Sequence, residues 1–198
     1  MSRNLVNSIS FFSPIIVSSS VLLFSIFSGT LVKGIFYIFW LLVITFFRIT
    51  VLMTVFSSGE TVQNKPSICV NSELLPYDGS TYSIFILGFT AMYFIVPMLY
   101  IGSLNFNVAS FFVVYMIFDL FIKLSNGCVT NVFRLIGDIV SGLALGGAVT
   151  SIILSTPIKS YLFINEVNKN NEVCSKPSKQ TFKCNVYKNG ELISSSIR

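Results

Sequence analysis

The chain has 198 residues, of which 53% are hydrophobic and only 11% are charged. Its mean hydropathy is +0.78. Soluble proteins carry about 25% charged residues, so this composition argues against a water-soluble globule. The formal net charge is +5, with seven Lys or Arg against three Glu from Lys159 onward. We therefore expect a membrane protein with a basic extramembrane tail.

Five apolar runs are long enough to cross a bilayer, whose hydrocarbon core needs about 20 residues of helix. They cover residues 11–31, 34–56, 83–101, 108–124 and 135–154. The sequence thus predicts an all-α membrane protein, a polytopic bundle of about five transmembrane helices within residues 1–155. The longest polar segment between the runs, 57–82, contains Pro66, Pro76 and Gly79 and is typical of a loop.

Residues 156–198 are expected to form an extramembrane tail. The segment TFKCNVY alternates in polarity and is followed by Asn-Gly at 189–190 and by a second strand-like run. Asn-Gly favours a hairpin because both turn positions need a positive φ, so we expect a small β-hairpin at about 181–197. A lone hairpin is marginally stable, which favours packing against a partner protein. The tail lysines that we expect at this contact are Lys176, Lys179, Lys183 and Lys188.

The distribution of basic residues predicts an orientation. With five crossings, Lys33 and the tail lie on the same side of the membrane. Cytoplasmic segments carry an excess of Lys and Arg, so this side is expected to be cytoplasmic. The tail is then either a solvated cytoplasmic extension or a contact for anionic lipid, nucleic acid or an acidic protein surface. Sequence-specific binding of nucleic acid is not expected.

The four cysteines, Cys69, Cys128, Cys174 and Cys184, form no CxxC pair, and the chain contains no histidine. A zinc site of cysteine and histidine ligands is therefore excluded, and neither a metal nor a cofactor is expected. Cys69 and Cys128 fall in loops, and the other two fall in the tail. This placement permits a disulfide within each group without showing one.

A few charged residues fall inside the spans, where a central charge costs about 2.5–3.5 kcal/mol on insertion scales. Arg48 is therefore expected to face the bundle, either as the partner of Asp138 or of loop carboxylates, or as a phosphate-binding group. Asp119 and Lys123 are i,i+4 neighbours, which is typical of a local ion pair. Asp138 opens the last span, where the helix dipole favours a carboxylate.

The last span is also rich in small residues. It contains Gly142, Gly146 and Gly147 together with two alanines. Small residues at this spacing let helix backbones approach closely. We expect tight packing within the chain rather than dimerisation.

The order of these motifs resembles the phosphatidic acid phosphatase type 2 superfamily, with its sphingomyelin-synthase-like branch as the nearest shape. The likeness rests on Arg48–Thr54 (RITVLMT), a loop with Cys69, Asp78–Thr81 at the start of the third span, and Asn126–Ala148. The resemblance implies a site that contacts a phosphate or a lipid headgroup. Its residues would be Arg48, Gly79, Ser80, Arg134 and Asp138.

The histidines of that family are replaced in this chain. The family attacks phosphate with one histidine and protonates the leaving group with another, and the matching positions hold Arg134 and Ser80. Arginine stays protonated and has no lone pair for attack, and serine is a poor proton donor near neutral pH. The adjoining motif Ser and Arg fall on Gly127 and Cys128, and the first motif, K-x6-R-P, is absent as written. We therefore expect no enzymatic activity.

Two kinds of function follow from these observations. The first is a non-enzymatic, multi-pass membrane protein with a structural or scaffolding role in a larger assembly, such as a virion membrane linked to capsid or core. The compact, aromatic-rich and loop-poor build is similar to that of membrane proteins of large DNA virus particles. The alternative is a lipid phosphatase or phosphotransferase with Cys128 or Ser80 as nucleophile, or a pseudoenzyme that binds a lipid headgroup. The small number of intramembrane charges disfavours a transporter.

Overall fold

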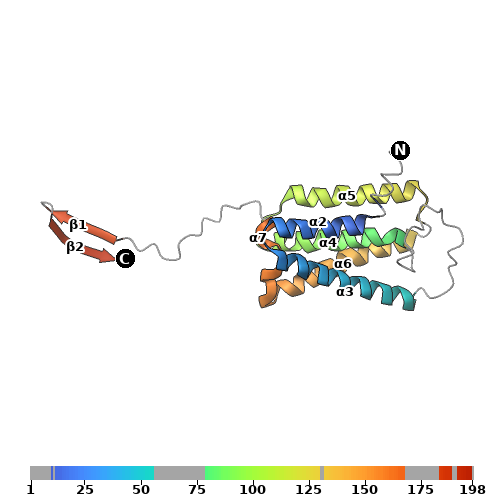
Figure 1. Ribbon diagram of the computed structural model, residues 1–198, viewed down its shortest axis with the longest axis horizontal. Coiled ribbons are helices and arrows are strands. Elements are labelled where there is room, and N and C mark those ends of the chain that lie inside the picture. The colour runs from blue at the N-terminus through green and yellow to red at the C-terminus, as the bar shows by residue number, and fades with distance from the viewer. Residues whose placement is uncertain are drawn as a thin grey trace.

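The structure is a computed structural model, and it describes residues 10, 12–55, 79–129, 132–167, 183–188 and 191–197. Five helices form an elongated bundle (Figure 1). They are α2 (Ser13–Phe27), α3 (Leu31–Val55), α4 (Gly79–Ile101), α5 (Phe106–Ser125) and α6 (Val132–Leu154). A 3₁₀ helix, η2 (Pro157–Tyr161), and one turn of helix, α7 (Ile164–Val167), follow.

Four of the helices are long and apolar enough to span a membrane: α3, α4, α5 and α6. The first expected span, 11–31, is realised only as α2, whose 15 residues make a helix of about 22 Å. It is apolar but shorter than the roughly 20 residues that a bilayer core requires. The chain turns after Phe27, with Gly29 at φ 66°, and enters α3 at once. The expected length of this first span was therefore wrong.

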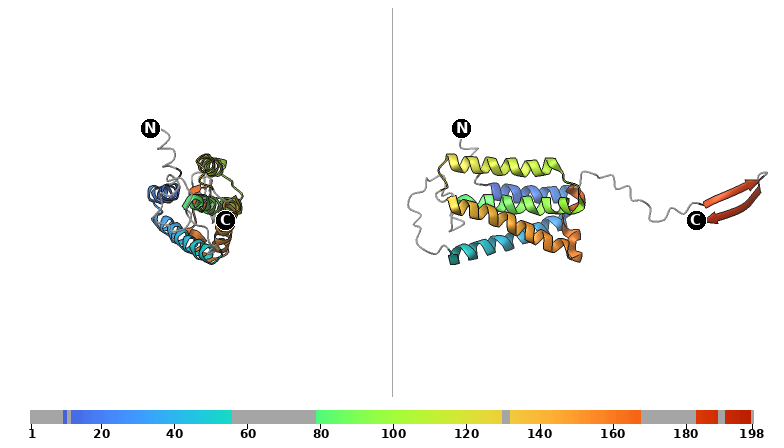
Figure 2. Two further views of the ribbon diagram at one scale, coloured as in Figure 1. Left: turned by 90° about the vertical axis from the view of Figure 1, so that its right-hand side faces the viewer. Right: turned by 180° about the vertical axis from the view of Figure 1, so that it is seen from behind.

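Helix α4 lies in the middle of the bundle, surrounded by the other four (Figure 2). It runs antiparallel to α3, because hydrogen bonds join Thr45 to Tyr82 and Tyr37 to Thr90. It runs parallel to α6, as the packing of Gly142 and Gly146 described below requires. Helix α4 is accordingly much more buried than the outer helices.

Glycines set the distance between α4 and α6. A Cβ atom added at Gly142 would lie 2.4 Å from the backbone oxygen of Phe85, and one at Gly146 would lie 2.6 Å from that of Phe89. No side chain fits at either position. The expected close packing within the chain is therefore confirmed for Gly142 and Gly146, whereas Gly147 meets only the end of the Met92 side chain.

The bundle has two distinct ends. The tail end carries the turns at Gly29 and Gly102 and the segment 155–167, and the amino end carries Ser10 and the turn at Gly127 (Figure 1). At the tail end, Lys33 forms an ion pair with Glu166 at 2.7 Å. Lys33 and the start of the tail therefore lie at the same end of the bundle, whereas the sequence predicts the same side of a membrane.

Residues 155–167 fold back over the tail end of the bundle. Leu162 and Phe163 are buried, and the ring of Phe163 lies 5.4 Å from that of Phe94 and 5.8 Å from that of Phe24. Tyr161 packs against Phe36 at 5.4 Å. This segment is therefore part of the bundle, and the expected boundary at residue 155 falls inside the folded unit.

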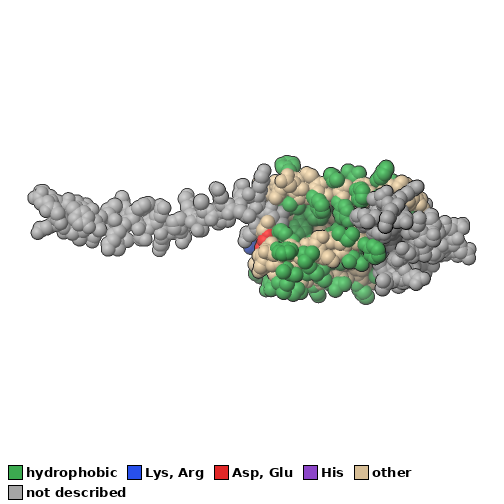
Figure 3. All heavy atoms as spheres, turned by 45° about the horizontal axis from the view of Figure 1, so that its top comes forward, with side chains coloured by type: hydrophobic (Ala, Val, Ile, Leu, Met, Phe, Trp, Pro, Cys, Tyr) green, Lys and Arg blue, Asp and Glu red, His purple; other side chains and the backbone are tan. Residues whose placement is uncertain are grey.

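Apolar side chains are spread over the face of the bundle seen in Figure 3, with few charged side chains among them. Large exposed examples include Phe27, Phe46, Phe106, Phe121 and Phe133. Soluble monomers rarely expose apolar patches of this extent. The surface, like the helix lengths, is consistent with an integral membrane protein.

Two antiparallel strands, β1 (Lys183–Lys188) and β2 (Glu191–Ile197), pair near the C-terminus. Lys183 faces Ile197 and Lys188 faces Glu191, with a register shift between Val186 and Tyr187. The strands lie within the range in which the sequence predicts a hairpin. Lys176 and Lys179 lie outside the described residues, as do the side chains of Lys183 and Lys188.

Candidate functional site

Arg48, Thr81 and Asp138 form a buried ionic group at the amino end of the bundle. The Arg48 Nε and Nη2 atoms donate to the two carboxylate oxygens of Asp138, each at 2.9 Å. Thr81 donates its only hydroxyl proton to Asp138 and accepts a longer bond of 3.4 Å from Arg48 Nη2. The three residues are 2–6% exposed, so this is a bidentate ion pair shielded from its surroundings.

Aromatic rings complete the surroundings of Arg48. Its guanidinium carbon lies 5.4 Å from the ring centres of both Tyr82 and Phe85. Cations at this distance from a ring face are attracted to it. Arg48 therefore faces the bundle and pairs with Asp138, which is one of the roles expected for it.

Lys123, Ser83 and Asp119 form a second group with the same design. Lys123 Nζ donates to Asp119 at 2.9 Å and also to Ser83, while Ser83 donates its hydroxyl proton to the same carboxylate. Ser10 donates to the other oxygen of Asp119. All four side chains are buried, so the expected i,i+4 ion pair is confirmed, but it is not a surface pair.

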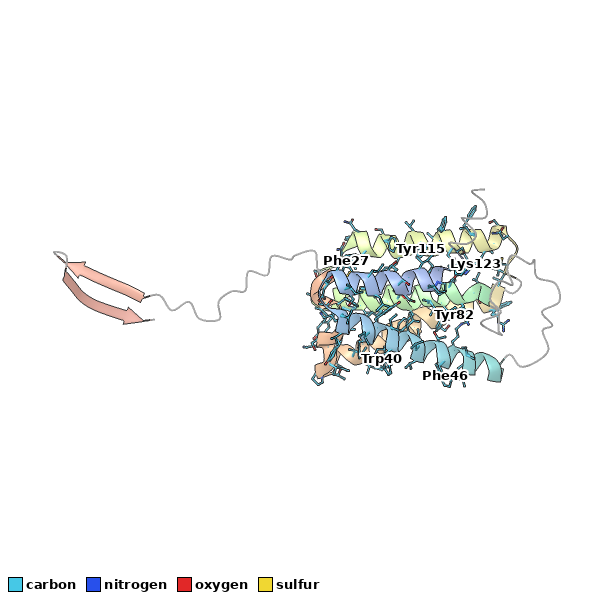
Figure 4. The ribbon with its side chains drawn as sticks, viewed as in Figure 1. Phe27, Trp40, Phe46, Tyr82, Tyr115 and Lys123 are labelled. Carbon is cyan, nitrogen blue, oxygen red and sulfur yellow. The ribbon has the colours of Figure 1, made fainter. Side chains whose placement is uncertain are left out.

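Both groups lie toward the amino end and take their hydroxyl from the first turns of α4. Successive residues of a helix are rotated by about 100°, so Thr81 and Ser83 point to nearly opposite sides of α4. Thr81 therefore faces α3 and α6, and Ser83 faces α5. Figure 4 places Tyr82 and Lys123 in this part of the bundle.

A cavity of about 180 Å³ adjoins the first group between α3 and α6. It brings together Arg48, Arg134 and Asp138, three of the five residues that the phosphatase resemblance singles out. The rest of the lining is mostly apolar and comprises Phe47, Val51, Phe85, Phe133, Gly137, Ser141 and Leu145. The Nη1 group of Arg48 donates to none of the described residues.

The remaining expected site residues have other positions. Gly79 and Ser80 are the first two residues of α4, and the described side chains begin at Thr81. Asp138 lies almost two turns inside α6, which begins at Val132. The expected stabilisation by the helix dipole was therefore wrong for Asp138, because that effect fades within the first turn.

Cys128 is fully buried and forms a disulfide. The sulfur atoms of the other three cysteines lie outside the described side chains. A disulfide sulfur carries no thiolate, and only the thiolate is a nucleophile. Cys128 in this state is therefore unsuited to the nucleophilic role considered above.

Ser83 and Ser10 were not among the residues that the sequence singled out, and Thr81 was named only as the last residue of the Asp78–Thr81 motif. In the sequence they look like other hydroxyl residues of the helices, such as Ser18 and Ser20, which donate to a backbone carbonyl of their own helix. The sequence did contain one signal. Thr81 and Ser83 lie close together at the start of α4, and antiparallel packing brings this start next to the ends of α3 and α5, which carry charged residues.

Comparison of the chain with family models, with curated proteins and with solved structures gave no match.

Proposed function

We propose that this chain is a non-enzymatic, multi-pass membrane protein with a structural or scaffolding role. It would belong to a larger membrane-associated assembly, such as a virion membrane linked to capsid or core, and would contact protein partners through its basic tail. The observation that carries this proposal is that Arg48 and Asp138 are paired with each other. They match the positions of a phosphatase-like site, yet they are joined to each other by two hydrogen bonds of 2.9 Å.

Two other ion pairs of the described bundle follow the same pattern. Lys123 and Asp119 pair in the second buried group, and Lys33 pairs with Glu166. Buried charges are affordable in a membrane protein when they are paired and hydrogen-bonded. These groups therefore support a role in holding helices together.

The proposal places the tail on the cytoplasmic side. Lys33 and Lys159 lie at the tail end, and the tail lysines follow Lys159 in the sequence, in keeping with the excess of basic residues on cytoplasmic faces. The disulfide of Cys128 lies at the opposite end, and disulfides persist in oxidising compartments. Two independent features thus support the same orientation.

Removal of residues 168–198 tests the scaffolding role. The truncated protein should stay in the membrane pellet after alkaline carbonate extraction, because the bundle is intact, and should lose its cross-links to partner proteins. A matched variant replaces Lys176, Lys179, Lys183 and Lys188 by glutamine and keeps the length of the tail. Cross-links that persist in both proteins would refute a tail-mediated contact.

A second candidate is a lipid phosphatase-like protein or a pseudoenzyme that binds a lipid headgroup in the cavity between α3 and α6. The observation in its favour is the meeting of Arg48 and Arg134 at one cavity, since guanidinium groups are well suited to oxyanions. Native mass spectrometry with phosphatidic acid tests binding, which Arg134→Gln should weaken. Turnover of labelled phosphatidic acid or ceramide that is lost in Ser80→Ala would instead establish an enzyme.

A further inference from the structure

Helix α5 has buried residues at two places along its length. Its buried residues are Phe112 toward the tail end and Asp119, Ile122 and Lys123 toward the amino end. Phe112 stacks on Phe94 at 5.7 Å, and the ionic side chains bind Ser83 and Ser10. Beside the Phe112 contact, α5 is separated from α2.

A groove of about 290 Å³ lies at this place between α2 and α5, with α4 as its floor. Six of its eight lining side chains are apolar. They are Val21 and Phe24 from α2, Phe94 from α4, and Val108, Phe111 and Phe112 from α5. Stacked rings of Phe94, Phe112 and Phe163 form a firm base next to it.

The groove is too short to form a protein interface by itself. Its α5 side runs from Asn107 to Phe112, about 8 Å along the helix. A stable protein interface needs about 800 Å² per partner, which so short a groove cannot supply. A single hydrocarbon chain of the surrounding bilayer is narrow enough to fill it.

The two polar residues of the groove fit a lipid whose headgroup lies at the tail end. Ser20 donates its hydroxyl proton to the Ile16 carbonyl, so it offers no donor to a ligand. Asn107 lies in the first turn of α5 and is exposed, and its side-chain amide makes no hydrogen bond to any described residue. That amide can donate to an ester or phosphate oxygen at the mouth of the groove.

We infer that this groove is a binding site for one acyl chain of a bilayer phospholipid, with Asn107 at the glycerol or headgroup end. The site lies on the other side of α4 from the Arg48 cavity and uses none of its residues. The inference rests on the bundle lying in a bilayer, and it is independent of the role proposed for the tail.

Photo-cross-linking of the full chain in phosphatidylcholine nanodiscs tests the site. A small fraction of the lipid carries a diazirine on one acyl chain, and cross-linked peptides are mapped by mass spectrometry. We expect cross-links to concentrate on Val21, Val108 and Phe111 and to saturate as the labelled fraction rises. Val108→Trp fills the groove and should reduce these cross-links at least fivefold.

Val114→Trp is the matched control, because Val114 is on the same helix and is 64% exposed. It should leave the groove cross-links unchanged. Labelling that spreads evenly over the outward face of α5 without saturation would identify ordinary boundary lipid and overturn the inference. A cross-linked polypeptide from a partner would overturn it as well. If Val108→Trp loses its cooperative melting transition, Val108→Leu takes its place, and unchanged labelling in that variant is the refuting result.

Discussion

At the scale of single residues, buried hydroxyl groups hold the charged side chains of this bundle in a fixed orientation. Thr81 and Ser83 each have one proton, and each gives it to a carboxylate, so each can only accept from its cation. The result is the same arrangement twice: a cation that donates both to a hydroxyl and to a carboxylate, and a hydroxyl that donates to that carboxylate. Every member is thereby fixed in orientation.

Breaking the Arg48–Asp138 pair should be costly. Asp138→Leu leaves a buried guanidinium without its carboxylate and is expected to lower the free energy of unfolding by about 3–5 kcal/mol. Arg48→Met should cost a similar amount, whereas the double variant should recover most of the loss because no buried charge is left alone. Denaturation in detergent measures all three proteins, with Lys159→Met at the exposed tail end as a control. Additive losses would show that the two side chains do not act as a pair.

Two buried tyrosines allow a paired test of hydrogen bonding in the core. Thr90 gives its proton to the Ile86 carbonyl, so the Tyr37 hydroxyl must donate to Thr90 at 2.8 Å. The ring of Tyr93 lies 5.3 Å from that of Tyr37. Its hydroxyl is buried and has no hydrogen-bond partner among the described residues.

Replacement of each tyrosine by phenylalanine should therefore have opposite effects. Tyr37→Phe is expected to lower the free energy of unfolding by about 1 kcal/mol, and Tyr93→Phe to raise it by about 1 kcal/mol, because an unsatisfied buried group is removed. Thermal melting of both variants in one detergent provides the comparison. A loss of stability in Tyr93→Phe would reveal a partner for its hydroxyl.

At the scale of elements, the α4–α6 contact depends on a backbone approach that only glycine permits. Thr81 with Asp138, Phe85 with Gly142 and Phe89 with Gly146 pair at the same sequence offset, one turn apart each time. The parallel contact therefore runs from the ionic group toward the tail end along one face of each helix. By contrast, α5 relies on an aromatic contact and an ionic group.

Gly142→Ala should separate α4 from α6. Its Cβ would meet the Phe85 backbone oxygen, so a loss of about 1–3 kcal/mol in unfolding free energy is expected. Gly137 is the control within α6, because nothing lies within 4 Å of an added Cβ there. Gly137→Ala should stabilise the helix by about 0.5–1 kcal/mol. Equal effects at the two positions would contradict the close approach.

At the scale of the whole molecule, four long helices return the chain to the end where α3 begins. Lys33 and residues 155–167 meet there whether or not α2 crosses the bilayer completely. The directions of α3 to α6 and the ion pair thus place Lys33 and residues 155–167 at the same end of the bundle. The orientation that we propose puts this end of the bundle on the cytoplasmic side.

Added cysteines on the exposed residues Ser160 and Ser125 test this orientation in sealed vesicles. A membrane-impermeant maleimide with a polyethylene glycol mass tag should add one extra tag to Ser160→Cys from the cytoplasmic side, relative to the unchanged chain. Ser125→Cys should gain its tag only from the opposite side or after the membrane is opened. Labelling of both from one side would contradict the proposed topology.

Much of the architecture follows from the sequence because apolar runs of membrane length leave few alternatives to helices. The sequence predicts the spans that form α3 to α6. It also predicts that Lys33 lies near the tail and that Gly142 and Gly146 allow close packing of helices. The length of α2 could not be predicted, since its end is set by the turn at Gly29 and by the contact of Ser25 with Gly34, where Ser25 Oγ accepts from the Gly34 amide at 3.0 Å.

What the sequence determined by itself is the apolar, helical character of the chain and the presence of a few charges that must face inward. Only the tertiary structure decided which charges meet. The sequence contains several carboxylates that could pair with Arg48. It also does not indicate that Ser83 and Ser10 form hydrogen bonds to Asp119. The reason is physical: the distance between helices in the bundle depends on glycines and hydroxyl groups, whose effect appears only when a neighbouring helix is in place.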